Sequence, residues 1–369
     1  MTSLVMGTEG LDVLFDTLER EGYTIVGPTV RDQTVVYEHL HSPADLPVGI
    51  GDDQEGGHYR LVDRSDDARF GYNLGQTSWK RFLYPPRTDL FRVIRGNDGI
   101  VFETVDDPGA RYAFVGVRAC ELAAIEVQDG VFTGPNMSDP TYARRRDEAL
   151  FVAVNCGQAA PTCFCTSMGT GPRCSTGFDI VMTEILDGDD PRYVVDSGSD
   201  RGADIMLDLP GRETTSADMA HVEESMLRAE RDIVRRMETE GIRDLLVANP
   251  NHERWADVAD RCLACGNCTM VCPTCFCSTT EDSVTLDGTA VRSRRWDSCF
   301  TLEFSALHGR PVRGDTRSRY RQWMTHKLAT WHDQFGRSGC VGCGRCITWC
   351  PVGIDITQEV AAMRETAES

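Results

Sequence analysis

The sequence lacks several features that mark membrane, secreted and nucleic-acid-binding proteins. No apolar run approaches the roughly 20 residues needed to span a bilayer. The N-terminal segment MTSLVMGTEGLD has no basic stretch followed by an apolar one, as a signal peptide would have. Basic residues are also scarce, because 38 Lys and Arg stand against 57 Asp and Glu, a formal net charge of −19. This balance disfavours nucleic acid or an anionic membrane as the main partner, so we expect a cytoplasmic protein that binds neither.

Motifs for nucleotide binding and catalysis are missing as well. No G-x-G-x-x-G follows a predicted strand, since GTGPRC at 169–174 lacks the third glycine and opens no obvious helix, and there is no P-loop. No nucleophile stands beside a base in the sequence, because the histidines are scattered. We therefore predict no catalytic residue in this chain.

Cysteine, by contrast, is abundant, with 16 residues in a chain of 369. Small secreted proteins use cysteines as disulfides to replace a missing core. A chain of this length with 41% hydrophobic residues can bury a core of its own. We therefore expect these cysteines to be reduced and to bind metal.

Two copies of C-x2-C-x2-C-x3-C-P occur, at 262–273 and 340–351. Three cysteines spaced by two residues wrap a loop around three irons of a cubane cluster, whereas the fourth binds the other cluster in two-cluster ferredoxins. Structural zinc is also often held by four thiolates, but its motifs normally come as separated cysteine pairs, so we predict two [4Fe–4S] clusters. The predicted ligands are Cys262, Cys265, Cys268 and Cys350 for cluster 1, and Cys340, Cys343, Cys346 and Cys272 for cluster 2.

The pentapeptide PTCFC also occurs twice, at 161–165 and 273–277. In an extended segment residues i and i+2 point to the same side, so both sulfurs of C-x-C can face one metal site. The first copy follows two cysteines that each end a predicted strand, and open α/β sheets place their sites at the carboxyl ends of strands. A third [4Fe–4S] cluster, cluster 3, would have the ligands Cys120, Cys156, Cys163 and Cys165, with Cys174 as a spare. The alternative is that these cysteines are buried as small apolar side chains.

The second copy, with Cys275 and Cys277, has only Cys299 as a further companion, one thiolate short of a cubane. Two interpretations stay open. These cysteines either pack around the cluster ligands, or complete a site with the first copy across a domain interface. Buried cysteine is the default when ligands do not add up.

Hydrophobic periodicity predicts an α/β N-terminal domain over 1–215. A helix is expected from Thr8 to Gly22, and the apolar runs at 112–117, 150–155 and 178–186 alternate with helical stretches. A connecting helix is expected within 216–250, from Ala217 to Glu240. Its apolar stripe comprises Met219, Val222, Met226, Ala229, Ile233 and Met237. An α+β two-cluster ferredoxin-like domain follows over 251–369.

A large insertion, 274–339, separates the two ferredoxin motifs. Exchange of the fourth ligands requires its ends to return close together, and loop-closure cost rises only slowly with length. We expect the insertion to fold on itself as a subdomain, with a turn and strand at LDGTAVRSRRW and a helix at RYRQWMTHKLATWHDQF.

Basic residues concentrate in one window of the insertion. Its members are Arg292, Arg294, Arg295, Arg310, Arg313, Arg317, Arg319 and Arg321. Such a run is usually a solvated face. The other interpretation is a positive surface around anionic clusters or for an acidic partner.

The motifs in this order resemble a known family. The segments WKRFLYPP (79–86), GVRACELAAIEVQD (116–129), NCGQAAPTCFCTSMGTGP (155–172), CGNCTMVCPTCFC (265–277), WDSCF (296–300), RYRQWMTHK (319–327) and CVGCGRCITWCPVGID (340–355) are similar to the iron–sulfur β subunit of cytoplasmic sulfhydrogenases, which are NAD(P)-linked nickel–iron hydrogenases. The equivalent electron-transfer subunit of anaerobic sulfite reductase is similar too. The resemblance covers nearly the whole chain.

The resemblance implies an electron conduit between a flavin- and NAD(P)-binding subunit and nickel–iron hydrogenase subunits, or sulfite reductase subunits. A freestanding ferredoxin-type carrier is a different class of function, but it would not need the large N-terminal domain. An enzyme with its own flavin in that domain is a further alternative, which bound flavin in the isolated chain would reveal.

Overall fold

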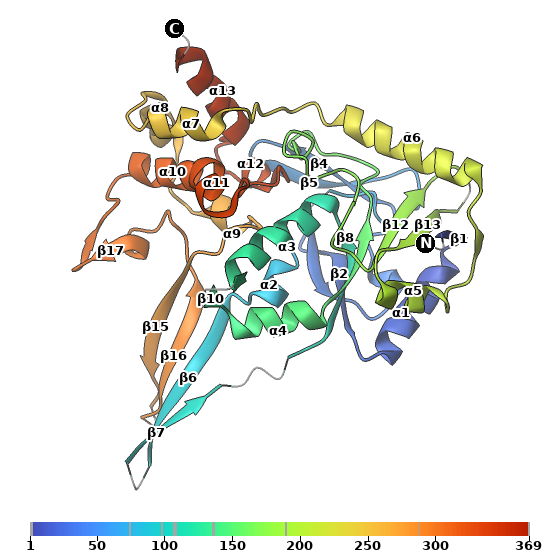
Figure 1. The fold of residues 1–369 in the computed structure, drawn as a ribbon, viewed down its shortest axis with the longest axis horizontal. Helices are drawn as coiled ribbons and strands as arrows, with labels where there is room; N and C mark the ends of the chain where they lie inside the picture. The colour runs from blue at the N-terminus through green and yellow to red at the C-terminus, as the bar shows by residue number, and fades with distance from the viewer. Residues whose placement is uncertain are drawn as a thin grey trace.

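The structure is a computed structural model, and it describes residues 3–73, 75–96, 99–105, 109–134, 137–188, 190–286 and 288–367. An eight-stranded sheet organises the N-terminal part in the order β14-β1-β13-β12-β11-β8-β2-β3 (Figure 1). β2, β8, β11 and β12 run parallel, and the outer pairs are antiparallel. The bounds are β1 (Ser3–Met6), β2 (Thr24–Arg31), β3 (Thr34–His39), β8 (Tyr112–Val117), β11 (Leu150–Val154), β12 (Ile180–Ile185), β13 (Arg192–Ser197) and β14 (Arg212–Glu213). The three apolar runs correspond to β8, β11 and β12.

Helices cover both faces of this sheet, because its central strands are apolar on both sides. Phe114 and Phe151 point into a core that includes helix α3 (Ala119–Phe132), whereas Val115 and Val152 point into a core that includes α1 (Glu9–Arg20) and α5 (Asp200–Met206). This alternation is the two-residue period of a strand. The result is the α/β layer architecture that the sequence predicts.

The connecting helix is shorter than predicted. α6 spans Ser216–Asp232, and residues 233–240 are not helical. Ile233 packs in the core beside α3, while Met237 packs in the C-terminal core. An extended chain rises more than twice as far per residue as a helix, which lets these two side chains reach separate cores. Met219, expected on the buried stripe, is 44% exposed.

The insertion does not fold on itself alone. Its hairpin, β15 (Ser278–Val284) and β16 (Ala290–Trp296), pairs through β16 with β6 (Arg87–Gly96), and β7 (Gly99–Thr104) completes a four-stranded sheet. Residue 287, in the predicted turn, lies outside the described residues. The sheet projects from the molecule (Figure 1). It joins the insertion to the N-terminal region, which sequence periodicity cannot reveal.

Short helices surround the two ferredoxin motifs. They are α7 (Ile242–Ala248), α8 (Arg254–Arg261), α9 (Asn267–Met270), α10 (Thr316–Thr325), α11 (Trp331–Phe335), α12 (Arg345–Thr348) and α13 (Ile356–Ala367), with one π turn at His326–Thr330. Their apolar faces share one core with the cysteines. This C-terminal region packs beside α3 (Figure 1).

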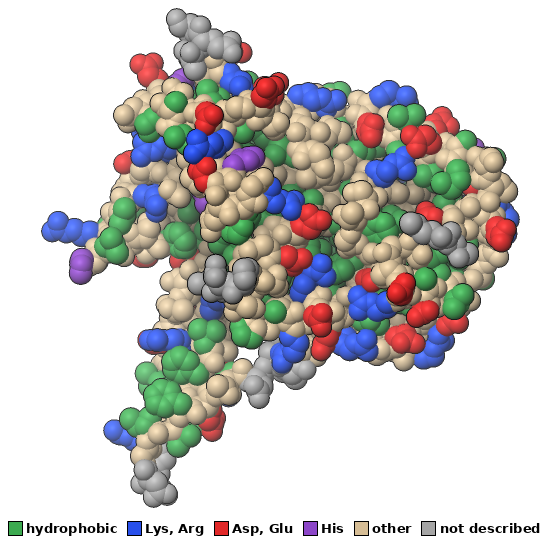
Figure 2. All heavy atoms as spheres, in the orientation of Figure 1, with side chains coloured by type: hydrophobic (Ala, Val, Ile, Leu, Met, Phe, Trp, Pro, Cys, Tyr) green, Lys and Arg blue, Asp and Glu red, His purple; other side chains and the backbone are tan. Residues whose placement is uncertain are grey.

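The smaller elements lie around these units. They are a 3-10 turn (Pro43–Asp45), β4 (Ile50–Glu55), β5 (His58–Asp63), α2 (Lys80–Leu83), β9 (Thr133–Gly134), β10 (Met137–Ser138), α4 (Pro140–Glu148), a second 3-10 turn (Glu303–Ser305), β17 (Ala306–Leu307) and β18 (Arg310–Pro311). Acidic and basic side chains are interspersed over the face in Figure 2, and apolar side chains gather on the projecting sheet. None of the described helices has the length and apolar character needed to cross a bilayer.

Candidate iron–sulfur sites

The first ferredoxin loop leaves α8 at Cys262 and enters α9 after Gly266. Ala264 and Gly266 both have positive φ, 51° and 78°. These left-handed residues turn the chain tightly, so that the side chains of successive cysteines point inward. A side chain at residue 266 would meet Ser298 Oγ at 3.0 Å, so the sequence keeps glycine there.

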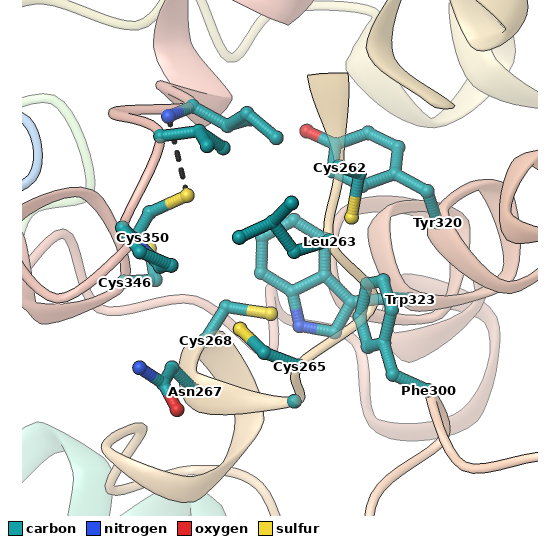
Figure 3. Close-up of a pocket in the computed structure, with 14 residues that line it drawn as sticks. Cys262, Leu263, Cys265, Asn267, Cys268, Phe300, Tyr320, Trp323, Cys346 and Cys350 are labelled. Atoms are coloured by element: carbon teal, nitrogen blue, oxygen red, sulfur yellow. Dashed lines mark hydrogen bonds between the residues drawn. The ribbon is translucent and has the colours of Figure 1, made fainter. Parts of the chain in front are cut away.

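The three cysteines of this loop line one pocket together with Cys350 (Figure 3). The rest of the wall is largely apolar and includes Phe300, Tyr320 and Trp323. The backbone N–H of Ile354 donates to Cys350 Sγ at 3.3 Å, and that of Ala264 donates to Cys262 Sγ at 3.4 Å. Such N–H···S bonds favour the thiolate form that a cluster requires. The four residues predicted to hold cluster 1 therefore surround a single cavity.

The second ferredoxin loop brings Cys340, Cys343 and Cys346 near Cys272. Burial is the main cause that raises the pKa of Cys346, and the nearby Cys340, Cys343 and Cys272 raise it further. Cys272 differs, because its pKa is lowered by a hydrogen bond from the Cys275 thiol and by the charge of Lys327. The residues predicted for cluster 2 thus also gather in one buried place.

Two buried lysines lie beside this second group, and the sequence reasoning missed both. Lys327 Nζ lies 3.3 Å from Cys272 Sγ, 2.9 Å from Thr274 Oγ1 and 3.3 Å from the Gly339 carbonyl oxygen. Lys80 Nζ donates to the carbonyls of Cys272 and Cys275 and lies 4.1 Å from the Trp296 ring centroid. A signal for Lys327 was present, since it falls at helical spacing from the buried Tyr320, Trp323 and Met324.

The third cysteine group forms at the carboxyl ends of β8 and β11. Cys120 lies in the first turn of α3, and Cys156 follows β11. With Cys163 and Cys165 they line one pocket, to which Arg118 and Cys343 also contribute. Cys174 is not among the residues that line it, and its Sγ lies 3.8 Å from the Val154 carbonyl oxygen. The structure therefore brings together the four residues predicted for cluster 3 and leaves the spare aside.

The second and third groups share a wall. The backbone N–H of Phe164 donates to the Gly342 carbonyl at 2.9 Å. A side chain at residue 342 would approach the Phe164 carbonyl carbon and oxygen to 2.7 Å, and one at residue 344 would approach the Thr162 carbonyl oxygen to 2.6 Å. The two glycines therefore let the second ferredoxin loop lie directly against the first PTCFC copy.

A fully buried ion pair fixes this junction. Arg345 on α12 donates to Glu121 on α3 at 2.8 Å, and the Tyr37 hydroxyl donates to the same carboxylate at 2.8 Å. Glu121 therefore does not lie on the helix surface, because its side chain is 0% exposed. Glu126, on the same helix, is exposed and pairs with Arg337.

The second PTCFC copy lies with the ferredoxin motifs. Cys275 hydrogen-bonds Cys272, and Cys277 hydrogen-bonds Cys299. The partial burial of Cys275 and its contact with a predicted cluster 2 ligand agree with the packing interpretation of this copy.

Several arginines of the basic window have acidic or carbonyl partners. Arg292 pairs with Asp282, Arg294 with Asp139, and Arg295 with Glu281. Arg317 and Arg321 donate to backbone carbonyls at 251 and 250. These partners favour the solvated face over a positive surface at the clusters.

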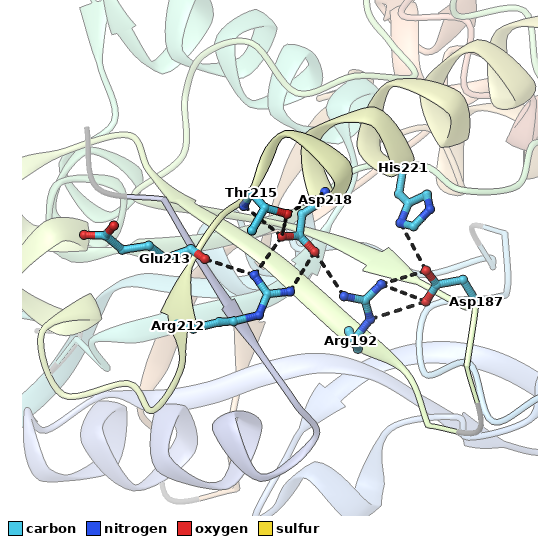
Figure 4. Close-up of polar contacts among 7 residues, drawn as sticks. All are labelled: Asp187, Arg192, Arg212, Glu213, Thr215, Asp218 and His221. Atoms are coloured by element: carbon cyan, nitrogen blue, oxygen red, sulfur yellow. Dashed lines mark hydrogen bonds and ion pairs between the residues drawn. The ribbon is translucent and has the colours of Figure 1, made fainter.

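A polar groove of about 580 Å³ opens elsewhere, near the ends of β11 and β12. Asp187 and His221 stand at it, and Arg192 links Asp187 to Asp218 at the start of α6 (Figure 4). Its charged lining comprises Arg64, Arg228, His221, Asp66, Glu184, Asp187, Glu224 and Asp232. This excess of carboxylates disfavours the phosphates of a flavin or nicotinamide dinucleotide.

A single metal ion needs its ligands close to one point, with zinc–sulfur distances of about 2.3 Å. Across the described parts of the chain, no three Cys, His, Asp or Glu side chains meet that requirement. The predicted ligands of clusters 1 and 3 each stand around a pocket.

The comparisons with known proteins agree with this donor set. Residues 261–354 match the family described as a 4Fe-4S dicluster domain. The chain is 31% identical over 313 residues to sulfhydrogenase 2 subunit beta of Pyrococcus furiosus, which covers 83% of this chain and 89% of that protein. The chain belongs to the sulfhydrogenase β-subunit family. No solved structure matches it significantly.

The family gives the cysteine groups their chemistry. A sulfhydrogenase β-type chain with a 4Fe-4S dicluster domain is an iron–sulfur protein of electron transport, and it carries [4Fe–4S] clusters. The matched range, 261–354, contains both ferredoxin loops and the insertion between them.

Proposed function

We propose that this chain is the electron-transfer iron–sulfur subunit of a cytoplasmic multi-subunit oxidoreductase. It relays electrons between a flavin- and NAD(P)-binding subunit and nickel–iron hydrogenase subunits. One observation carries the proposal: the three cysteine groups are contiguous. Cys346 also lines the cluster 1 pocket, and Cys343 also lines the cluster 3 pocket. Cluster 2 therefore stands between the other two, as a relay requires.

The ligand sets in this proposal are the three that the sequence predicts. Reversible one-electron transfer is the chemistry that clusters supply when bound. The chain's own residues hold the sulfurs, exclude water with aromatic side chains, and set the charge around each cluster. None of these tasks requires a proton donor or a nucleophile, which agrees with a protein that is not catalytic alone.

The relay is tested by reconstitution. The purified, cluster-loaded chain alone is expected neither to oxidise NAD(P)H nor to consume hydrogen. With the flavin subunit it should be reduced by NAD(P)H, and with the hydrogenase subunits it should be reduced by hydrogen. Turnover of either substrate by the single chain would contradict the proposal.

The alternative partner set is that of an anaerobic sulfite reductase, whose electron-transfer subunit shares the motifs 265–277 and 340–355. Purification of the native complex separates the two cases. Nickel in the complex supports the hydrogenase partner, whereas sirohaem supports the sulfite reductase partner.

Cluster 3 is part of the same proposal, and iron counting tests it. With three cubanes the chain should hold about 12 irons, and with two about 8. Changing Cys163 and Cys165 together to Ser should remove about four irons. The matched change of Cys275 and Cys277, the same pair in the second copy, should leave the count nearly unaltered. A native iron count near eight would show that the cysteines of the first copy only pack in the core.

A further inference from the structure

The base of the insertion hairpin brings two cysteines together that no cluster uses. Ser278 pairs with Trp296 at the first rung of the β15–β16 ladder. One step further, the N–H of Asp297 donates to the Cys277 carbonyl at 2.8 Å, and Cys299 follows two residues later. A turn in which Thr301 N–H donates to the Ser298 carbonyl returns the chain toward the ladder. Two residues 22 positions apart thus meet where the hairpin closes.

These two sulfurs face each other directly. Cys299 donates a side-chain hydrogen bond to Cys277, and this bond is the main cause that lowers the pKa of Cys277 to about 7. The same contact, together with burial, raises the pKa of Cys299. The predicted ligands of clusters 1 and 3, in contrast, stand around pockets. Cys277 and Cys299 line neither of those pockets, and their contact places the two sulfurs to bond to each other.

The pair also lies next to residues of two cluster sites. Cys268, a predicted cluster 1 ligand, is close enough to Cys299 to act on it electrostatically. Lys327, which touches the predicted cluster 2 ligand Cys272, acts on both Cys277 and Cys299. Neither cysteine is fully buried. The pair can therefore exchange electrons with the clusters and protons with solvent.

We propose that Cys277 and Cys299 form a redox-active dithiol that stores two electrons beside clusters 1 and 2. In oxidation the two thiols release two protons and two electrons, the sulfurs form one disulfide bond, and the oxidised clusters accept the electrons one at a time. Reduction reverses each step. This proposal rests on the proposed electron-transfer function, because the clusters are its oxidant and reductant. Such a pair links the two-electron transfer of a nicotinamide to the one-electron transfer of the clusters.

Thiol trapping tests the pair in the full-length, cluster-loaded protein. Samples are poised anaerobically at a reducing and at an oxidising potential, quenched in denaturant with excess N-ethylmaleimide, and digested for mass spectrometry. We expect Cys277 and Cys299 to be labelled in the reduced sample and joined in one disulfide-linked peptide pair in the oxidised sample. A reductive titration should count two more electrons in the native protein than in Cys277→Ser.

Iron content separates this proposal from its rivals. Cys277→Ser and Cys299→Ser should keep the native iron count, and so should the control Cys174→Ser. Of these three variants, only Cys174→Ser should still form the disulfide in the oxidised sample. Loss of about four irons from Cys277→Ser would overturn the proposal in favour of a further cluster. Full labelling of both cysteines in the oxidised sample would overturn it as well. A native protein without iron would instead refute the electron-transfer function itself.

Discussion

The two ferredoxin-type groups share a motif but not an environment. Around Cys262, Cys265 and Cys268 the wall is aromatic and aliphatic, and Cys265 is exposed. Around Cys272, two buried ammonium groups, from Lys80 and Lys327, lie within contact of the cysteine or its backbone. The motif spacing predicts which cysteines hold each cluster, whereas segments far away in the sequence determine the charge beside each group.

This difference has a consequence for electron flow. Adding an electron makes a cluster more negative, so a nearby fixed positive charge favours the reduced form. The second group should therefore have the higher reduction potential of the two. Electrons that enter at cluster 1 would collect at cluster 2, which lies between the other two sites.

The largest expected effect comes from removing a predicted cluster ligand from one of the two groups. Cys272→Ala should remove the cluster whose other ligands are Cys340, Cys343 and Cys346, a loss of about four irons. The reason is that Cys272, although it belongs to the first motif, lies among the cysteines of the second. Electron paramagnetic resonance with iron analysis measures which signal is lost.

Cys350→Ala is the matched change at the other crossed position. It should remove the cluster held by the first loop, because Cys350 lines that pocket. If Cys272→Ala removed the signal of the first-loop cluster alone, the crossed assignment would be wrong.

The next effect concerns the junction between the second and third groups. Glu121→Gln should destabilise the protein by about 3–5 kcal/mol, because it leaves the buried Arg345 charge uncompensated. Glu126→Gln is its control on the same helix. Glu126 pairs with Arg337 at the surface, and an exposed pair contributes about 0–1 kcal/mol. Anaerobic urea unfolding compares them, and equal losses would refute the structural role of the buried pair.

The sequence predicted those features that depend on local spacing. The strands β8, β11 and β12 follow from apolar runs, and the grouping of Cys350 with the first loop follows from the motif. Cys120 and Cys156 were predictable because each ends a strand of a parallel sheet.

The features it missed depend on contacts between distant segments. Glu121 carries a helix-compatible carboxylate, and its role appears only when α12 places Arg345 beside it. The pairing of β16 with β6 joins residues about 200 positions apart, so no local pattern encodes it. α6 ends early because Ile233 and Met237 are drawn into different cores, which a helical stripe cannot distinguish from one long face.

A smaller effect tests the charge difference between the two ferredoxin-type groups directly. Lys327→Met should lower the reduction potential of cluster 2 and leave that of cluster 1 nearly unchanged. At an effective dielectric constant of about 20, two unit charges about 4 Å apart interact with about 4 kcal/mol. Lys327 lies 3.3 Å from Cys272 Sγ, so removing it withdraws that stabilisation from the reduced cluster. A potentiometric titration followed by electron paramagnetic resonance resolves both clusters, and an equal shift in both would contradict a local effect.

The smallest effect comes from a buried histidine next to the charged second group. His326 precedes Lys327, and its ring lies against Phe276 and Trp331. Burial, with the charges of Lys327 and Arg313, lowers the pKa of His326 to about 4 from 6.5. Because the unfolded chain takes up a proton near pH 6.5 and the folded one only near pH 4, stability should fall as pH drops through this window. After a discount for the partial exposure of the ring, the loss should approach about 2 kcal/mol at the acid end. His326→Phe keeps an aromatic ring without the titrating group, so it should lose less stability than the native protein between about pH 7 and about pH 5. His41→Phe, at an exposed site, should follow the native protein. An unchanged pH dependence in His326→Phe would contradict the lowered pKa of His326.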